Sequence, residues 1–136
     1  MRYEDPAFLT KALESLAGAE SEFANERYTN CANRCYYAAF QAAVAALDEH
    51  GFVPPRGRGR TTWSHEALPA TFVGELINRR KVYSPELRDT LSRLASLREA
   101  ADYTPDFISE TQAFRALRRT RTFVAAIVQH RGDDQQ

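Results

Sequence analysis

The fold of this chain is decided by residues 31–49, which read CANRCYYAAFQAAVAALDE. As a helix, this stretch is apolar on most sides and crowded with alanine, and small side chains let neighbouring helices approach closely. Such a helix belongs at the centre of a bundle. We predict that Thr29 or Asn30 is its N-cap and that Gly51 ends it.

A helix is predicted on the N-terminal side of this central one. Asp5 and Pro6 form an N-cap followed by proline at the first helical position. The expected buried stripe recurs at helical spacing and consists of Phe8, Ala12, Leu16, Ala19 and Phe23.

Three more helices are predicted on the C-terminal side. One runs from about Ser64 to Asn78, with Pro69 expected to distort its first turns. A second opens at Ser84-Pro85 and ends near Asp102. The third follows the capping box Ser109–Gln112. Its expected buried face consists of Ala113, Leu117, Thr120, Val124 and Ile127. The sequence therefore predicts an all-α antiparallel bundle of about five helices over 1–131, and a disordered tail at 132–136.

The charge of the chain is balanced overall but segregated along its length. Its 136 residues hold 18 basic and 18 acidic side chains, a length typical of one domain. Residues 1–26 hold six acids and two bases, residues 51–81 six bases and two acids, and residues 110–131 five bases and one acid. Because acidic and basic segments cancel each other, the zero net charge does not exclude a basic surface that binds nucleic acid.

The remaining compositional signals predict a cytoplasmic protein without metal or cofactor. The N-terminus lacks the apolar run of a signal peptide, and the apolar stretch 35–47 is too short to span a bilayer. Cys31 and Cys35 share one helical face, where cysteine usually packs as a small apolar residue. No phosphate-binding glycine motif and no Ser–His–Asp order is present.

Arg98 breaks the apolar pattern of its helix. Leu87, Leu91 and Leu94 step by four and then three residues, and the next position in that stripe is Arg98. A guanidinium on an apolar face is costly unless it is paired, and Asp102 lies one turn away. Two interpretations remain open: a buried Arg–Asp pair that fixes helix register, or an arginine in a cleft or dimer interface that faces an anionic ligand.

The central helix contains a similar anomaly. Arg34, Tyr36 and Tyr37 lie within its apolar sequence, and Arg34 and Tyr37 are one turn apart, close enough to stack or share hydrogen bonds. His65, at the start of the next helix, is a candidate acid–base group because imidazole exchanges protons near neutral pH. The structural alternatives are a satisfied core tyrosine and a capping or packing histidine.

Three clusters of basic residues point to RNA. Arg56, Arg58 and Arg60 alternate with glycine in a Gly/Pro-rich loop, a pattern that can follow a phosphate backbone. The second cluster is Arg79-Arg80-Lys81. The third lies in the last helix and comprises Arg115, Arg118, Arg119 and Arg121. Each cluster alone is typical of a solvated face, but together they favour contact with RNA.

Three motifs resemble the HEPN domain, in particular small prokaryotic members encoded beside a minimal nucleotidyltransferase. They are Asn33-Arg34-x-Tyr36-Tyr37-Ala38-x-Phe40 in the central helix, His65 before the next helix, and Leu97-Arg98-x-x-Ala101-Asp102-Tyr103 at the end of another. The resemblance covers about residues 7–128. It implies a homodimeric helical bundle in the cytoplasm, whose active members are metal-independent ribonucleases of toxin–antitoxin systems.

In active members of the family, an arginine followed four to six residues later by a histidine carries the cleavage. Here Arg98 matches the arginine, but Tyr103 stands where the histidine would be. A phenol is a weaker proton acceptor at neutral pH than an imidazole. The resemblance makes Arg98 the principal catalytic candidate, with Tyr103, Asp102, Glu99 and His65 as supporting groups.

The resemblance also gives Tyr103 a second candidate role. In such toxin–antitoxin pairs, the nucleotidyltransferase can adenylylate a tyrosine beside this motif and so neutralise its partner. Asn33, Arg34, Tyr36 and Tyr37 are then expected to line the cleft. The alternative interpretation is a non-catalytic helical dimer that binds nucleotide or the nucleotidyltransferase.

Overall fold

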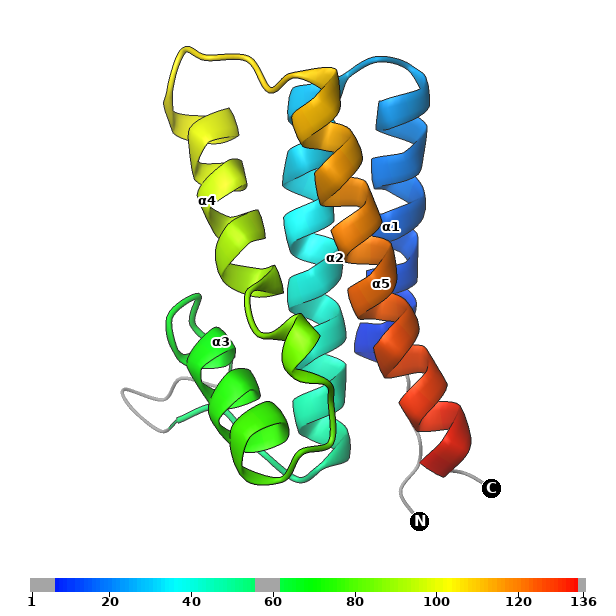
Figure 1. Ribbon diagram of the computed structural model, residues 1–136, viewed down its shortest axis with the longest axis vertical. Helices are drawn as coiled ribbons and strands as arrows, with labels where there is room; N and C mark the ends of the chain where they lie inside the picture. Colours follow the sequence, from blue (N-terminus) through cyan, green and yellow to red (C-terminus); the bar gives the residue numbers. More distant parts are fainter. Residues whose placement is uncertain (1–6, 56–61, 135–136) are drawn as a thin grey trace.

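The computed structural model describes residues 7–55 and 62–134, and within these ranges the chain is helical with no strand. The α-helices are α1 Ala7–Ala24, α2 Tyr28–Glu49, α3 Ala67–Thr71, α4 Thr90–Tyr103 and α5 Glu110–Asp134. A π-helical segment, η1 Phe72–Arg79, and a 3-10 turn, η2 Pro85–Leu87, lie between α3 and α4. Figure 1 shows the four long helices side by side, with the short α3 beside one end of α2. The predicted all-α antiparallel bundle is confirmed.

α2 occupies the centre, as its sequence predicted. It contacts α1, α3, α4 and α5. Its fully buried alanines are Ala32, Ala38, Ala39, Ala42, Ala43 and Ala46. With only a methyl group at each of these positions, neighbouring helices can approach α2 on more than one side.

The two ends of α2 differ in how well the sequence located them. The predicted N-cap at Thr29 or Asn30 is wrong, because the chain reverses through Glu26 at φ 61° and the helix begins at Tyr28. Thr29 Oγ1 instead accepts a hydrogen bond from the Ile108 backbone N–H at 3.4 Å. At the other end the prediction is confirmed, since Gly51 follows the helix with φ 84°, a conformation that glycine adopts without strain.

α1 packs on α2 through a stripe that differs at one position from the predicted one. Ala12 and Ala19 are fully buried, whereas Phe8 is 44% exposed and Leu9 takes the buried place. Phe8 and Leu9 lie four and three residues before Ala12, and both spacings fit one helical face, so the pattern alone does not separate them. The predicted cap at Asp5-Pro6 lies outside the described residues.

The segment that carries His65 is less regular than predicted. The Ala67 N–H donates to Ser64 Oγ at 2.9 Å, and α3 begins at Ala67, three residues after the predicted start. Pro69 lies in the first turn, where its missing N–H costs nothing. The distortion lies after Pro69 instead, in the wider π-helical turns of η1 from Phe72 to Arg79.

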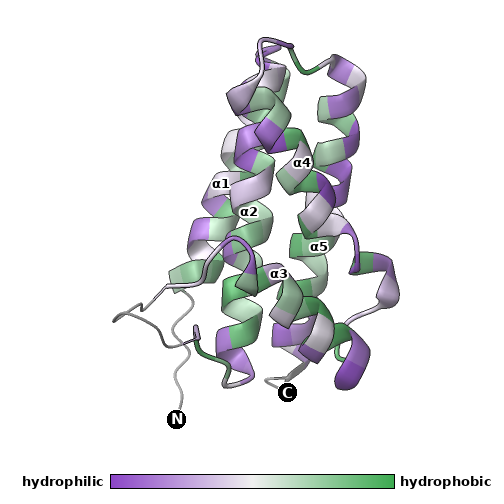
Figure 2. Ribbon diagram, turned by 90° about the vertical axis from the view of Figure 1, so that its left-hand side faces the viewer, coloured by the Kyte–Doolittle hydropathy of each residue, from purple (hydrophilic) through white to green (hydrophobic). Residues whose placement is uncertain are grey.

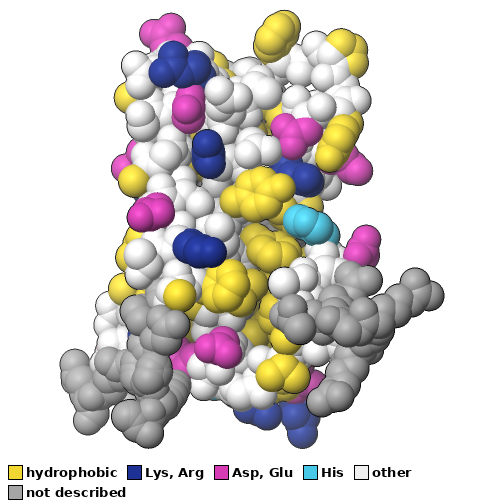
Figure 3. Space-filling model, turned by 180° about the vertical axis from the view of Figure 1, so that it is seen from behind, with side chains coloured by type: hydrophobic (Ala, Val, Ile, Leu, Met, Phe, Trp, Pro, Cys, Tyr) yellow, Lys and Arg dark blue, Asp and Glu magenta, His cyan; other side chains and the backbone are white. Residues whose placement is uncertain are grey.

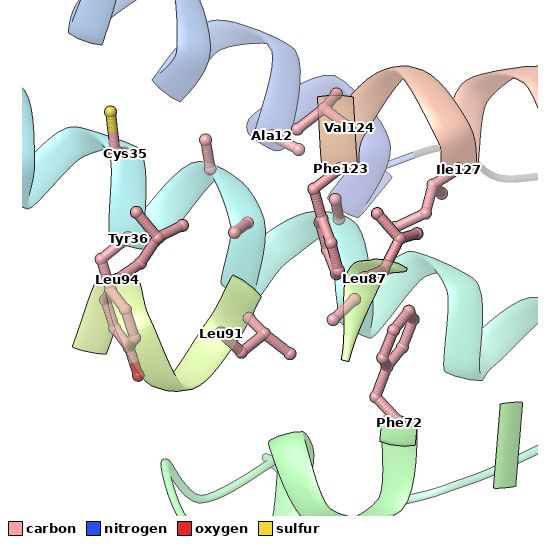
Figure 4. Packing of buried hydrophobic residues seen from close by; sticks show 14 of the residues in the cluster. Ala12, Cys35, Tyr36, Phe72, Leu87, Leu91, Leu94, Phe123, Val124 and Ile127 are labelled. Atoms are coloured by element: carbon pink, nitrogen blue, oxygen red, sulfur yellow. The ribbon is translucent and has the colours of Figure 1, made fainter. Parts of the chain in front are cut away.

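The Ser84-Pro85 signature initiates a short turn rather than the long helix. Ser84 Oγ accepts from the Glu86 N–H at 3.2 Å, which caps η2. α4 begins only at Thr90 and ends at Tyr103, one residue beyond the predicted end. The leucine stripe spans both elements, since Leu87, Leu91 and Leu94 are all buried against the core (Figure 4).

α5 confirms the capping box. The Gln112 N–H donates to Ser109 Oγ at 3.1 Å, and the Ser109 N–H donates to Gln112 Oε1 at 2.9 Å. All five residues predicted for its buried face are 2% exposed or less. The helix extends to Asp134, through the first three residues of the predicted tail, and 135–136 lie outside the described residues.

The core runs along the inner faces of the long helices. In Figure 2 hydrophobic residues lie mainly on the helix sides that face one another, with hydrophilic residues outside. Phe72 of η1 closes one end, with its ring centroid 5.1 Å from Phe123 and 5.5 Å from Tyr83 (Figure 4). No helix in the described part of the chain has the length and apolar character needed to cross a membrane.

Candidate functional site

Arg98 lies at the end of the buried stripe of α4, one turn beyond Leu94. Its side chain is only 17% exposed, against α2. The predicted partner is present, but at a distance: Arg98 Nε lies 3.6 Å from Asp102 Oδ2, and this buried nitrogen makes no hydrogen bond in the described structure. The pair is therefore an ion pair without a direct hydrogen bond from Nε.

Tyrosine rings supply the other contacts of the guanidinium. Its central carbon lies 5.0 Å from the ring centroid of Tyr36, 5.5 Å from that of Tyr37 and 5.9 Å from that of Tyr103. Burial lowers the pKa of Arg98, but Tyr37, Tyr103 and Asp102 raise it by more, so the guanidinium stays charged. Cation–π contacts of this kind each contribute about 0.5–2 kcal/mol.

Asn33 holds the carboxylate of this cluster. Asn33 Nδ2 donates to Asp102 Oδ2 at 2.9 Å and so joins α2 to the end of α4 across 69 residues of sequence. Asp102 Oδ2 thus faces both the amide and the arginine. The sequence placed both residues in the site but gave no indication that they contact each other.

Tyr36 connects Arg98 to His65. The Tyr36 side chain is buried, and its hydroxyl shares a hydrogen bond with Nδ1 of His65 while the two rings stack at 5.5 Å. Burial raises the pKa of Tyr36 to about 12, although Arg98 lowers it, so the hydroxyl is protonated at neutral pH. A neutral hydroxyl can donate to Nδ1 or accept from it, so it supports either neutral tautomer of the imidazole.

His65 itself is exposed and held by aromatic contacts. Its ring lies 5.0 Å from that of Phe40, and the Ser64 cap fixes the backbone that follows it. A permanent cation and an exposed imidazole therefore share one buried tyrosine. Arg98, Asp102, Tyr103, Asn33, Tyr36, Tyr37 and His65 form this arrangement, which we call the Arg98 cluster.

A hollow adjoins the Arg98 cluster. Its volume is about 530 Å³, and its lining includes Tyr37 and His65 of the cluster together with Phe40 and Trp63. Figure 3 shows hydrophobic side chains gathered along this side of the molecule, with a histidine beside them. Sequence reasoning missed Trp63, because it is 23 residues from Phe40 along the chain and only tertiary packing brings the two to one hollow.

The structure does not bring every predicted residue to the cluster. Arg34 is exposed on α2 and lies towards α1, with its Cδ 3.8 Å from where a Cβ of Gly18 would be. Arg34 therefore does not join Asn33, Tyr36 and Tyr37 beside Arg98, as the sequence analysis expected. Glu99 is exposed, and no hydrogen bond or ion pair joins it to another described residue. Arg56, Arg58 and Arg60 lie outside the described residues.

The two cysteines behave as core residues. Cys31 and Cys35 are free and fully buried, and the hydrogen bond with Cys35, together with burial, raises the pKa of the Cys31 thiol. Within 7–55 and 62–134, no group of three or more His, Cys, Asp or Glu side chains could hold a metal ion.

Comparison with known proteins agrees with this architecture. A family model described as HEPN domain matches residues 6–131, nearly the whole chain. A comparison with curated proteins finds no match. Because the matched region contains all of the bundle except the last turn of α5, and every member of the Arg98 cluster, the chain belongs to the HEPN domain family.

Proposed function

We propose that this protein is a toxin-like RNA-binding module that cleaves RNA without a metal ion, using Arg98 and His65. The observation that carries the proposal is the contact of one buried tyrosine, Tyr36, with both side chains. An RNA strand over the cluster would meet a fixed positive charge and a proton-exchanging group together. The missing histidine of the family motif, at Tyr103, is then replaced by a histidine from a different segment.

The chemistry needs only these groups and the RNA itself. The 2′-hydroxyl oxygen attacks the adjacent phosphorus, its proton passes to His65, and the bond to the 5′-oxygen breaks. Arg98 stabilises the charge that develops on the phosphoryl oxygens. A proton returns to the leaving 5′-oxygen from the imidazolium or from water. The products are a 2′,3′-cyclic phosphate and a free 5′-hydroxyl.

Cleavage of RNA by the purified chain in the presence of a chelator tests this proposal. Arg98→Ala is expected to lower the rate about 10²–10³-fold, and His65→Ala about 10²–10⁴-fold. Arg27→Ala is the matched control, because Arg27 is 58% exposed, pairs with Glu22 and belongs to none of the basic clusters. Circular dichroism and thermal melting establish that each variant is folded. Cleavage that survives both cluster substitutions would overturn the assignment.

We further propose a homodimer that is regulated by a minimal nucleotidyltransferase acting on Tyr103. Tyr103 is the last residue of α4, is 70% exposed, and has its ring 5.9 Å from the Arg98 guanidinium. The phenol oxygen would attack the α-phosphorus of ATP, and pyrophosphate would leave. A phosphate diester at this position would compete with RNA for Arg98 and repel the RNA backbone.

Intact-mass measurement after co-expression with a minimal nucleotidyltransferase tests the modification. One or more AMP groups are expected on the native chain and none on Tyr103→Phe, while Tyr28→Phe is modified like the native chain. An addition that maps elsewhere contradicts this role of Tyr103. Light scattering tests the dimer, and a monomer would contradict a site that is shared between two copies.

The second candidate function is a non-catalytic dimer that binds nucleotide or the nucleotidyltransferase. The observation that favours it is Tyr103 in place of the family's histidine. It predicts RNA or nucleotide binding that depends on Arg98, with no cleavage under any condition. A purely structural role for the Arg98–Asp102 pair predicts instead that Arg98→Met is neutral or stabilising and changes no activity.

A further inference from the structure

A second group of arginines lies on the other side of α4. Arg93 of α4 and Arg115, Arg118 and Arg119 of α5 line a hollow of about 440 Å³ between the two helices. An adjoining hollow of about 530 Å³ shares Arg93, Arg115 and Arg119. We call this surface the α4–α5 groove. Sequence reasoning found the arginines of α5 but not Arg93, because only the packing of the helices brings it opposite them.

The groove is separate from the Arg98 cluster. Arg93 and Arg98 are five residues apart on α4, and at about 100° per residue their directions differ by about 140° around the helix. Neither hollow of the groove is lined by a residue of the cluster. The helix itself therefore stands between the two sites.

The arginines of the groove contribute no ion pair to the described fold, although Arg118 lies over the ring of Phe114, 5.9 Å from its centroid. In the described part of the chain, none of the four forms an ion pair with a carboxylate. The last arginine of the predicted α5 cluster, Arg121, differs, since its Nε donates to Glu20 Oε2 at 2.8 Å. Four permanent charges held close together repel one another, and a bound anion removes that cost.

The rest of the lining indicates which anion fits. The linings also contain the hydrogen-bonding side chains of Ser92, Ser96, Gln112 and Thr122. Proteins contact phosphate oxygens with this combination of arginine, hydroxyl and amide groups. The two carboxylates, Glu86 and Asp89, line only the hollow nearer η2, so the unopposed positive charge lies towards Gln112.

No large aromatic side chain lines either hollow. Base stacking depends on such side chains, so a lining of arginine, hydroxyl and amide groups favours contact with phosphates over contact with bases. We infer that the α4–α5 groove binds the phosphate backbone of single-stranded RNA, independently of base sequence. This inference rests on the proposed function and adds a second contact surface to it.

The salt dependence of RNA binding tests the inference. For a single strand, the slope of log K against log salt is about −0.7 for each phosphate neutralised. The probe is a fluorescein-labelled oligouridine, whose binding is followed by anisotropy from about 50 to about 200 mM salt. Replacing Arg93, Arg115 and Arg119 together with alanine is expected to make the slope shallower by about 2.

A charge-matched variant controls for net charge. Lys11, Arg27 and Arg88 are exposed, contact other side chains outside the groove and belong to none of the basic clusters, so replacing these three with alanine removes the same charge. This control should keep the slope of the native chain. Equal slopes for the two triple variants would overturn the inference. It would also be overturned if the groove variant kept the native slope but no longer co-purified with a nucleotidyltransferase, because the groove would then bind that protein and not RNA.

The outcome is distinguishable from failure of the proposed function. A groove-dependent slope without any cleavage supports the groove and contradicts the ribonuclease. Arg98-dependent cleavage with no effect of the groove variant on the slope supports the ribonuclease and contradicts the groove. If oligouridine does not bind the native chain at all, both are wrong.

Discussion

The two sides of α4 use arginine in opposite ways. On one side Arg98 is 17% exposed, lies among three tyrosine rings and is 3.6 Å from a carboxylate that Asn33 holds. On the other, the groove arginines have no carboxylate partner among the described residues. A cation with fixed neighbours can be directed at one phosphoryl group, whereas unpaired exposed cations attract any polyanion.

This contrast predicts different sensitivities to substitution. The Arg98 side should depend on exact side-chain identity, because its contacts are directional and desolvated. The groove should depend mainly on the number of charges and on salt. The predictions below test this difference in order of the expected effect.

The largest effect concerns two leucines of α4 that differ in burial. Leu94 is 1% exposed, whereas Leu97 is only partly buried, although both line the hollow of the groove that contains Gln112. Leu94→Ala should lower the free energy of unfolding by about 2–5 kcal/mol, and Leu97→Ala by about 1 kcal/mol. Urea unfolding measures both. Equal losses would show that the two leucines are packed alike and would contradict the difference in burial.

The second effect is an alkaline loss of stability that arises from Tyr36. The pKa of Tyr36 is raised from 10.0 to about 12, chiefly by burial. Above pH 10 the unfolded chain releases this proton while the folded chain keeps it. The stabilisation is thus complete below pH 10 and is lost as the pH rises towards 12.

Comparison with Tyr36→Phe isolates this effect, since the other tyrosines cancel. The stability difference between the native chain and the variant should shrink by about 1.4 kcal/mol between about pH 9 and about pH 11. Urea unfolding at both pH values measures it. A difference that does not change with pH would mean that Tyr36 is accessible to water, and the connection between Arg98 and His65 would then be open rather than buried.

These tests also show which parts of the structure the sequence could predict. The capping box and the buried face of α5 were correct because both depend on residues within a few positions of one another. The side of α2 on which Arg34 lies was not predicted correctly. That helix is apolar almost all round, so the spacing of its apolar residues does not indicate which side faces α1. The same holds for Tyr36 and His65, which are 29 residues apart and meet only through tertiary packing.

The third effect uses a charge-conserving change on each side of α4. Lysine keeps the positive charge of arginine but loses the planar group that lies over the tyrosine rings. Arg98→Lys should lower RNA cleavage at least about tenfold, while Arg93→Lys should keep the salt slope of oligouridine binding. Single-turnover kinetics and anisotropy measure the two. A native cleavage rate for Arg98→Lys would show that charge alone suffices at both sites.

The smallest effect concerns Asn33, which holds the carboxylate beside Arg98. Asn33→Ala removes the 2.9 Å hydrogen bond to Asp102 and should cost about 1 kcal/mol of stability. Asn78→Ala is the control, because Asn78 Oδ1 accepts from Arg88 at 2.8 Å in a similarly exposed bond outside the cluster. Both variants should lose similar stability.

Only Asn33→Ala should also change the rate of RNA cleavage, since a released Asp102 can pair fully with Arg98 and withdraw it from the phosphate. A double-mutant cycle with Asp102→Asn tests this cause. If the carboxylate is what restrains Arg98, Asp102→Asn should restore cleavage in the Asn33→Ala background. A cleavage rate that stays low in the double variant would show that the Asn33 amide contacts the RNA directly. Asn33 would then be a binding residue and not a residue that positions Asp102.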